Sequence, residues 1–213
     1  MTTDAAYCLY HNPGWGSAIV EAQMAFYGLP HDLALAGDLF EDDSARAALA
    51  MINPLMQVPT LILPSGQVMR ESAAITLYLA DVTGRDALVP GPETPERAAF
   101  LRWLIFLVTA IYPTFAYGDL PERYVAADHA AAFQARMIAQ RKSLWGVVAA
   151  AAVPGGPWFL GTRFSAIDVY LACMVQWRPG KDWFAEHAPG LLAIADKVAA
   201  RHEFSAVLAR NFG

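Results

Sequence analysis

The most informative stretch of this sequence is Asn53-Pro54-Leu55-Met56-Gln57-Val58-Pro59-Thr60-Leu61-Ile62-Leu63. Its first half is rich in turn-forming residues and its second half is apolar, which predicts a loop that leads into a buried strand. Pro64-Ser65-Gly66-Gln67 then predicts a hairpin turn, and Val68–Met69 begins the returning strand. The apolar spacing after it predicts a helix over residues 71–80.

Elements of the same size precede this stretch. Residues 6–11 predict a short aromatic strand, and Asn12-Pro13-Gly14-Trp15-Gly16 predicts a turn. Apolar positions across Ser17–Tyr27 suit a helix, which is followed by an expected strand over His31–Leu35 and a short helix over residues 44–51. The order β-α-β-α-β-β-α predicts an open sheet with helices packed on it.

The second half of the chain predicts helices only. Three prolines and two glycines between residues 83 and 95 indicate a linker. We therefore expect an α/β domain over residues 1–82 and an all-helical domain over residues 96–213. Its helices are expected over residues 98–111, 126–152, 165–176 and 190–208, and Pro113 should kink or end the first of them.

Composition excludes several classes of function. A net charge of −5 argues against a nucleic-acid-binding protein, which needs clustered Lys and Arg. The amino terminus lacks a basic segment, so we expect no secretory signal, and the apolar stretch 103–112 is too short for a membrane span. Cys8 and Cys173 form neither a dithiol motif nor a zinc spacing, and the acidic run 38–43 predicts a solvated loop. We expect a cytoplasmic protein without a metal.

Three stretches, in the right order, resemble the glutathione-transferase superfamily. Residues 53–61 are similar to the family's Asn-Pro-x-Gly-x-Val-Pro-x-Leu, and residues 71–75 to its Glu-Ser-x-Ala-Ile. Ser165-Ala166-Ile167-Asp168 resembles the third motif, and the three together span most of the chain. The resemblance implies a thioredoxin-like α/β domain followed by a helical one, with glutathione as co-substrate and no metal.

The first motif implies a backbone contact to glutathione. A proline lowers the cost of a cis peptide bond, and the family's proline that matches Pro59 is cis. Val58 would then offer its N–H and C=O to the tripeptide as an added strand does, with Gln57 beside it. The alternative is a proline that only begins the strand at Thr60.

Glu71 and Ser72 stand where a helix begins after a strand. Unpaired N–H groups at a helix start attract a carboxylate, and the Ser72 hydroxyl adds a donor. The Glu71 carboxylate can take the ammonium group of the same γ-glutamyl end. The alternative is a capped helix with an acidic first turn, and both interpretations can hold together.

Ser165 and Asp168 have the spacing of a capping box, in which each side chain bonds the other's backbone N–H. We interpret this motif as structural, and we expect the loss of either partner to cost about 1 kcal/mol or more.

The thiol-activating group is less clear from the residues. Lowering a thiol pKa by two units takes about 2.7 kcal/mol, which one well-aimed donor at a helix start can supply. In the bacterial classes that resemble this turn the cysteine position falls on Gly16, and the tyrosine position of other classes falls on Leu9. Ser17 is therefore our predicted catalytic residue, with Trp15 as a glutathione contact. Asn12 and the amides of residues 15–17 are further candidates, and Ser17 as a plain N-cap is the alternative.

The glycine carboxylate of glutathione lacks an obvious cation. Arg46, Gln57 or a residue of a partner subunit would have to bind it. The resemblance also implies a homodimer, formed along the helices after the linker and the helix of Glu71. A small hydrophobic electrophile is expected between the domains, against Tyr112, Phe115 and Trp177.

The function that the resemblance implies is that of a glutathione transferase active in detoxification. The alternatives are a binding protein that kept the fold without the chemistry, a glutathione-dependent isomerase and a disulfide reductase.

Overall fold

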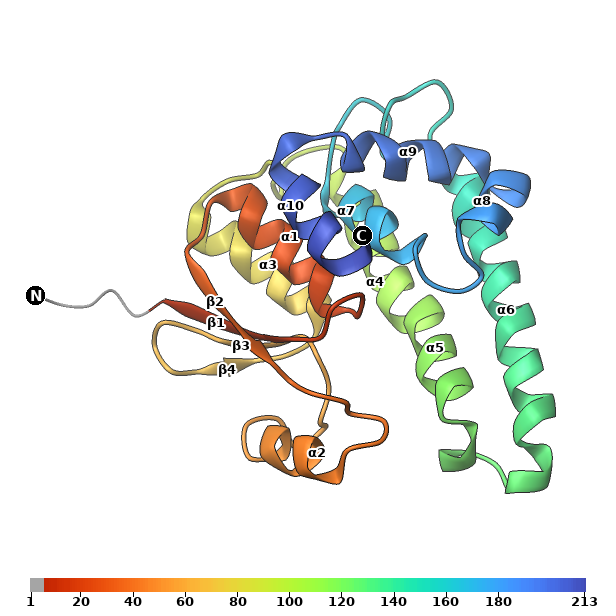
Figure 1. The fold of residues 1–213 in the computed structure, drawn as a ribbon. Helices are drawn as coiled ribbons and strands as arrows, with labels where there is room; N and C mark the ends of the chain where they lie inside the picture. Colours follow the sequence, from red (N-terminus) through yellow and green to blue (C-terminus); the bar gives the residue numbers. More distant parts are fainter. Residues whose placement is uncertain (1–5) are drawn as a thin grey trace, which may run out of the picture. The chain divides into compact units, whose positions relative to one another are not determined.

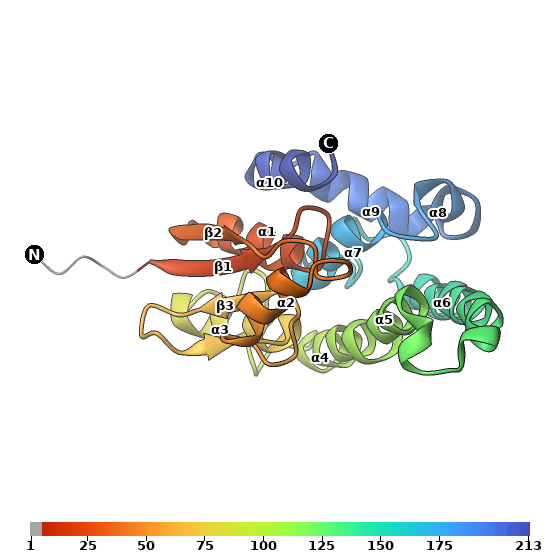
Figure 2. The same cartoon turned by 60° about the horizontal axis from the view of Figure 1, so that its bottom comes forward.

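The computed structural model describes residues 6–213 and divides into two compact units. One, which we call the α/β unit, comprises the chain up to residue 89 together with residues 197–213. The other, the helical unit, comprises residues 90–196, so the boundary lies inside the predicted linker. The predicted scheme differs at the C-terminus, where the last helix belongs with the α/β unit because it packs on the first helix (Figures 1 and 2).

The α/β unit is built on a mixed four-stranded sheet in the order β2-β1-β3-β4 (Figure 1). β1 pairs in parallel with β2 and antiparallel with β3, which in turn pairs antiparallel with β4. The strands are β1 (Tyr7–His11), β2 (His31–Leu35), β3 (Thr60–Ile62) and β4 (Val68–Met69). The thioredoxin-like α/β prediction is confirmed.

The helices α1 and α3 cover one side of this sheet, and α10, from the end of the chain, packs on α1 (Figure 1). α1 contacts β1, α3 and α10, and α2 lies on the other side of the strands (Figure 1). α1 keeps its predicted bounds because buried residues fill its length and Gly28 ends it in the left-handed conformation, at φ 69°. The helices are α1 (Ser17–Tyr27), α2 (Asp43–Ala50), α3 (Ser72–Thr83) and α10 (His202–Phe212).

The remaining helices are α4 (Arg97–Phe106), the π-helical η1 (Leu107–Ile111), α5 (Tyr112–Asp119), the short 3-10 turns η2 (Pro121–Arg123) and η3 (Ala127–His129), α6 (Ala130–Ala151), α7 (Ala166–Met174), α8 (Lys181–His187) and α9 (Pro189–Ala199). The helical prediction for this half is confirmed in kind. One helix predicted over residues 190–208 is instead α9 and α10, because Arg201 adopts an extended conformation between them. α8 had no predicted counterpart.

Pro113 does not end its helix. The π-helical turn η1 ends two residues before Pro113, and the helix continues as α5 to Asp119. A π-helical turn shifts the hydrogen-bond pattern where proline lacks an N–H, which lets the helix pass through. Among residues 6–213, the continuous run Arg97–Asp119 is long and apolar enough to meet the criteria for a membrane span, unlike the shorter stretch considered above. Core helices of water-soluble proteins meet the same criteria.

Candidate functional site

The start of α3 is open. Its N-cap residue is Glu71, whose side chain makes no capping hydrogen bond and whose carboxylate is exposed. Within residues 6–213, the amides of Ser72, Ala73 and Ala74 and the hydroxyl of Ser72 have no hydrogen-bond partner. The helix thus presents three N–H groups and one hydroxyl, with a carboxylate beside them. This set can bind a group that carries both a carboxylate and an ammonium.

Glu71 also has an unusual backbone, with φ 67° and ψ 102°. A residue other than glycine in this region costs about 1 kcal/mol or more, and such residues gather at functional sites. The alternative of a capped helix with an acidic first turn is wrong, since Glu71 holds the N-cap position without a capping bond and the first turn has no acidic residue. No sequence signal announced this conformation.

The loop before β3 exposes the backbone of Val58. The Val58–Pro59 peptide bond is cis, as the resemblance implies. The Val58 side chain packs against a small apolar cluster of Ala36, Leu39 and Leu49. Its own N–H and C=O have no hydrogen-bond partner in the described part of the chain. Val58 is therefore anchored by its side chain and open along its backbone.

Asn53 holds this loop in shape, a role that the sequence analysis missed. It is 1% exposed, and its Nδ2 donates to the Gln57 carbonyl oxygen at 3.0 Å and to Thr60 Oγ1 at 2.8 Å. Its Oδ1 accepts from the Leu55 amide at 3.0 Å and from Arg70 Nη1 at 3.1 Å. The polar bonds fix the carbonyl of Gln57 and leave its exposed side chain toward solvent.

The turn before α1 buries the predicted catalytic hydroxyl. Ser17 is fully buried, and its Oγ accepts from the Asn12 amide and donates to the Asn12 carbonyl oxygen, each at 3.2 Å. The N-cap alternative for Ser17 is wrong, because Gly16 holds that position and Ser17 is the first helical residue. Within residues 6–213 the amides of Gly16 and Ser17 have no partner, so two N–H groups point out of the start of α1.

Trp15 joins this turn to the Val58 loop. Its side chain packs against the same apolar cluster as Val58 and Tyr10, and its ring lies 4.7 Å from the Phe40 ring, centroid to centroid. Of the predicted contacts, the structure thus brings Trp15 and Val58 onto one small core.

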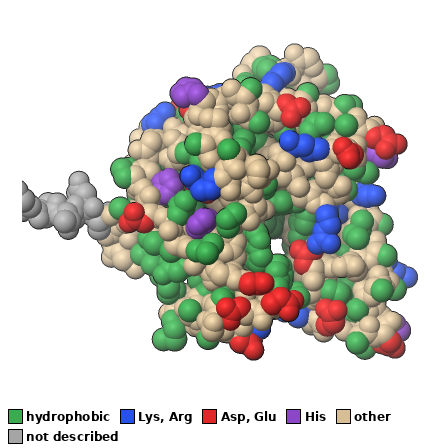
Figure 3. Space-filling model, in the orientation of Figure 1, with side chains coloured by type: hydrophobic (Ala, Val, Ile, Leu, Met, Phe, Trp, Pro, Cys, Tyr) green, Lys and Arg blue, Asp and Glu red, His purple; other side chains and the backbone are tan. Residues whose placement is uncertain are grey.

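Arg46, the predicted cation for a carboxylate, is already engaged. Its guanidinium donates to the carbonyl oxygens of Leu39 and Phe40, at 3.2 and 2.7 Å, and pairs with Asp43. Acidic side chains gather over α2 and the loop before it (Figure 3), where the carboxylate of Asp42 caps the helix. The acidic run is a solvated loop, as predicted. Arg70, next to Glu71 in the sequence, is exposed, and within residues 6–213 its guanidinium donates to Asn53 Oδ1 alone.

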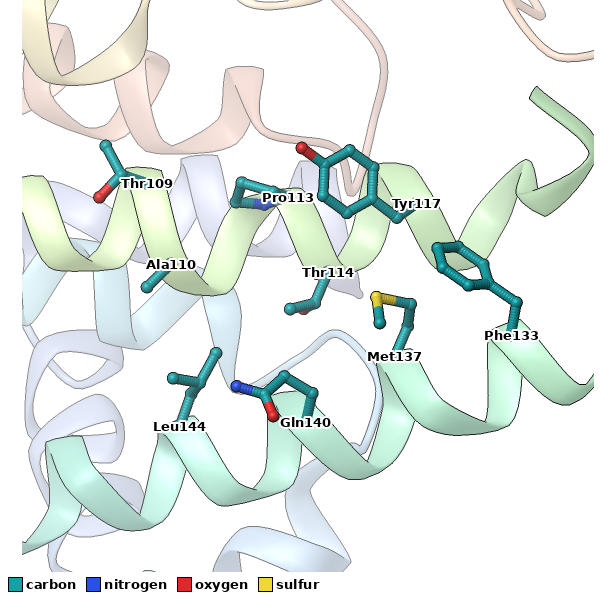
Figure 4. Close-up of a pocket in the computed structure, with 9 residues that line it drawn as sticks. All are labelled: Thr109, Ala110, Pro113, Thr114, Tyr117, Phe133, Met137, Gln140 and Leu144. Carbon is teal, nitrogen blue, oxygen red and sulfur yellow. The ribbon is translucent and has the colours of Figure 1, made fainter. Parts of the chain in front are cut away.

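The helical unit contains a groove of about 490 Å³ between α5 and α6 (Figure 4). Its lining is mostly apolar, with hydroxyl and amide groups among the side chains: Thr109, Ala110, Pro113, Thr114, Tyr117, Phe133, Met137, Gln140 and Leu144. The three rings expected to contact an electrophile pack edge to face on one another: Tyr112, Phe115 and Trp177. Burial raises the pKa of Tyr112 well above its ordinary value, so its hydroxyl stays protonated.

Among residues 6–213, no group of three or more His, Cys, Asp or Glu side chains could hold a metal ion. Within the described residues Cys8 and Cys173 form no disulfide, and burial raises the pKa of the Cys8 thiol. The polar groups of the candidate site are therefore amides, hydroxyls, one carboxylate and one guanidinium.

Known proteins resemble this chain over nearly its whole length. It is 36% identical over 203 residues to the uncharacterized GST-like protein YncG of Escherichia coli (strain K12), covering 95% of this chain and 97% of that one. A glutathione transferase structure from Methylococcus capsulatus matches with a TM-score of 0.78 and 28% identity, covering 96% and 98% of the two chains. A sphingomonad glutathione S-transferase complexed with glutathione matches with a TM-score of 0.71 and 26% identity, covering 95% and 97%.

The family model for the glutathione S-transferase N-terminal domain matches residues 19–82, which hold most of α1, the Val58 loop and most of α3. The sequence identity, the thioredoxin-like sheet and the helical unit agree with one another. The chain belongs to the glutathione S-transferase superfamily.

Proposed function

We propose that the protein is a glutathione transferase that binds glutathione on its α/β unit and activates the thiol for attack on a small hydrophobic electrophile. The observation that carries the proposal is the open start of α3, where an unpaired hydroxyl, three unpaired amides and a carboxylate stand together. Helices α4, α6, α8 and α10 also lack a side-chain cap, so what distinguishes α3 is the exposed Glu71 carboxylate and the Ser72 hydroxyl beside its amides.

In this proposal the γ-glutamyl end of glutathione binds at α3. Its carboxylate accepts from the Ser72 hydroxyl and the neighbouring amides, and its ammonium pairs with Glu71. The peptide backbone pairs with the N–H and C=O of Val58, which Pro59 follows, as an added strand would. Trp15 and Gln57 flank the ligand, and the glycine carboxylate takes Arg70, since Arg46 is engaged elsewhere.

The thiolate is stabilised by the unpaired amides of Gly16 and Ser17 rather than by the Ser17 hydroxyl. The hydroxyl already donates to and accepts from the Asn12 backbone, whereas the two amides have no partner in the described residues. Hydrogen bonds to a charged group contribute about 1.5–3 kcal/mol each, so two amides suffice to lower a thiol pKa by two units.

The electrophile is proposed to bind on the helical unit, with the α5–α6 groove as its candidate site. A cytoplasmic homodimer that acts in detoxification completes the proposal. The occupied hydroxyl of Ser17 and the glycine at position 16 favour a second candidate, a protein that binds glutathione without activating it.

One titration separates these functions. Calorimetry with glutathione at millimolar concentration should show binding, and the ultraviolet thiolate band should appear at a lower pH than for free glutathione. Ser72→Ala should weaken binding about tenfold, because it removes a hydrogen bond to a charged group. Ser44→Ala, at the start of α2, is the matched control and should bind as the unaltered protein does.

Absence of binding at millimolar glutathione would overturn both functions. Binding without a shifted thiolate band would leave the second candidate and exclude the transferase.

A further inference from the structure

The C-terminal helix reaches the turn that starts α1. Asn211, on α10, is 8% exposed, and its Oδ1 accepts a hydrogen bond from the Gly14 amide at 3.1 Å. Its Nδ2 donates to Glu21 Oε2 at 3.0 Å and to the Val207 carbonyl oxygen at 2.9 Å. One side chain therefore connects α10, α1 and the turn between β1 and α1.

Glu21 determines which way the Asn211 amide faces. Glu21 is fully buried on α1, and its carboxylate is paired with Arg210, whose Nε lies 2.8 Å from Oε1. A carboxylate accepts hydrogen bonds and donates none, so Asn211 must turn its NH₂ toward Glu21. Its oxygen is then left to face Gly14. The Arg210 side chain is 46% exposed, whereas the Glu21 carboxylate is buried, so loss of its donors would leave a buried charge with fewer partners.

The turn is shaped for this contact. Gly14 has φ 78°, and a Cβ at this position would lie 3.2 Å from the Asn211 carbonyl oxygen. A residue with a side chain would be strained there and would press on α10. Gly14 stands two residues before Gly16. A hydrogen bond to the Gly14 amide therefore restricts the orientation of the Gly16 and Ser17 amides.

His11 lies close to the same charges from β1. Burial lowers its pKa, with Glu21 opposing that shift and Arg210 adding to it. A neutral imidazole at pH 7 leaves the Glu21–Arg210 pair as the charged core of the arrangement.

We infer that Asn211 is a positioning residue for glutathione thiol activation, acting through Gly14 and oriented by Glu21 and Arg210. This inference rests on the proposed function. While the hydrogen bond between Asn211 and the Gly14 amide (the tether) is intact, the Gly16 and Ser17 amides converge on the thiolate. When this bond is lost, the turn relaxes. Loss of the tether should therefore raise the thiol pKa while glutathione affinity, which depends on α3 and Val58, changes little.

The test compares variants in the full chain with glutathione bound. Asn211→Leu should raise the thiol pKa by about one unit, which leaves about tenfold less thiolate at a pH below that pKa. The dissociation constant of glutathione should change less than about threefold. Ser205→Ala, which removes an exposed hydrogen bond within α10, is the matched control and should change neither quantity.

A double variant distinguishes positioning from general damage to the fold. Glu21→Gln with Asn211→Asp exchanges acid and amide, so an oxygen still faces Gly14 and an NH₂ still joins the two side chains, although the bond to the Val207 carbonyl oxygen is lost. It should restore part of the thiolate that Asn211→Leu loses. Unchanged thiol pKa in Asn211→Leu, or equal losses of affinity and thiolate that the double variant does not rescue, would overturn the inference alone. A thiolate missing from the unaltered protein would overturn the proposed function, and the inference with it.

Discussion

The starts of α1, α3 and α7 each include a serine, but they differ in whether a side chain caps the helix. α7 begins with Ser165, whose side chain and that of Asp168 close the capping box reciprocally. Asp168 Oδ2 accepts from the Ser165 amide at 2.8 Å, and its Oδ1 accepts from the Phe159 amide at 2.7 Å. α1 and α3 also begin beside a serine, yet neither has a side-chain cap.

The difference separates structure from function within one chain. A closed start satisfies its own amides and stabilises the fold, whereas an open start leaves its donors to water or to a ligand. Helices α4, α6, α8 and α10 are uncapped as well, but α3 differs from them because its N-cap residue, Glu71, has a costly positive φ. We assign this strained, uncapped start to the γ-glutamyl end of glutathione.

The largest expected effect is a loss of stability when the capping box of α7 is opened. Asp168→Ala leaves the buried Phe159 and Ser165 amides unpaired and opens a small cavity, so the free energy of unfolding should fall by about 4 kcal/mol. Urea unfolding measures it, and calorimetry should show unchanged glutathione affinity at a temperature where the variant is folded. A loss of affinity without a loss of stability would break the comparison.

The same carboxyl should make stability depend on pH. Burial raises the pKa of Asp168 to about 6, although hydrogen bonds from Phe159 and Ser165 oppose the shift. The native state therefore holds a proton that the unfolded chain has already released above about pH 4. The contribution of the protonated Asp168 to the free energy of unfolding is about 3 kcal/mol. It is fully present below about pH 4 and is lost as the pH rises through about 6. Urea titrations from pH 4 to 7 should show a shallower slope for Asp168→Asn, and identical slopes would contradict the prediction.

At the open start of α3, a substitution should lower glutathione affinity and leave stability unchanged, the reverse of Asp168→Ala. Glu71→Gly removes the partner of the ligand ammonium, so glutathione should bind about thirtyfold more weakly, or about 2 kcal/mol. Glycine accepts φ 67° without strain, so the free energy of unfolding should not fall. Met56→Gly, at the other positive φ of a residue other than glycine among those described (52°), is the matched control and should keep its affinity. Parallel losses of affinity and stability would mean that Glu71 is structural.

The smallest expected effect is at Ser17. Ser17→Ala removes two bonds to the Asn12 backbone and should cost about 1 kcal/mol of unfolding free energy. The thiol pKa of bound glutathione should stay within about half a unit, because the amides remain. A rise of a full unit or more in the ultraviolet titration would return the role to the hydroxyl.

Much of the fold could be predicted from local sequence patterns. The bounds of α1 follow from an apolar run between two glycines, and the capping box follows from the spacing of Ser165 and Asp168. The sheet follows from turn residues that separate short apolar segments. These features depend on neighbours in the sequence, which is why they could be predicted.

The rest depends on contacts that no local pattern records. The Asn211–Gly14 bond joins residues 197 positions apart, and the positive φ of Glu71 is set by what surrounds it. The occupied hydroxyl of Ser17 belongs to the same class, since only the folded turn brings the Asn12 backbone to it. The family motif indicated where the site lies, and the structure was needed to sort its donors into occupied and available.

The α/β unit is discontinuous, since residues 197–213 return to it after the whole helical unit. During synthesis the ribosome delivers the sheet, α1 and α3 early, while the segment that bonds Gly14 is translated more than a hundred residues later. The nascent chain therefore passes through a stage in which the first unit has its sheet and lacks its final helix.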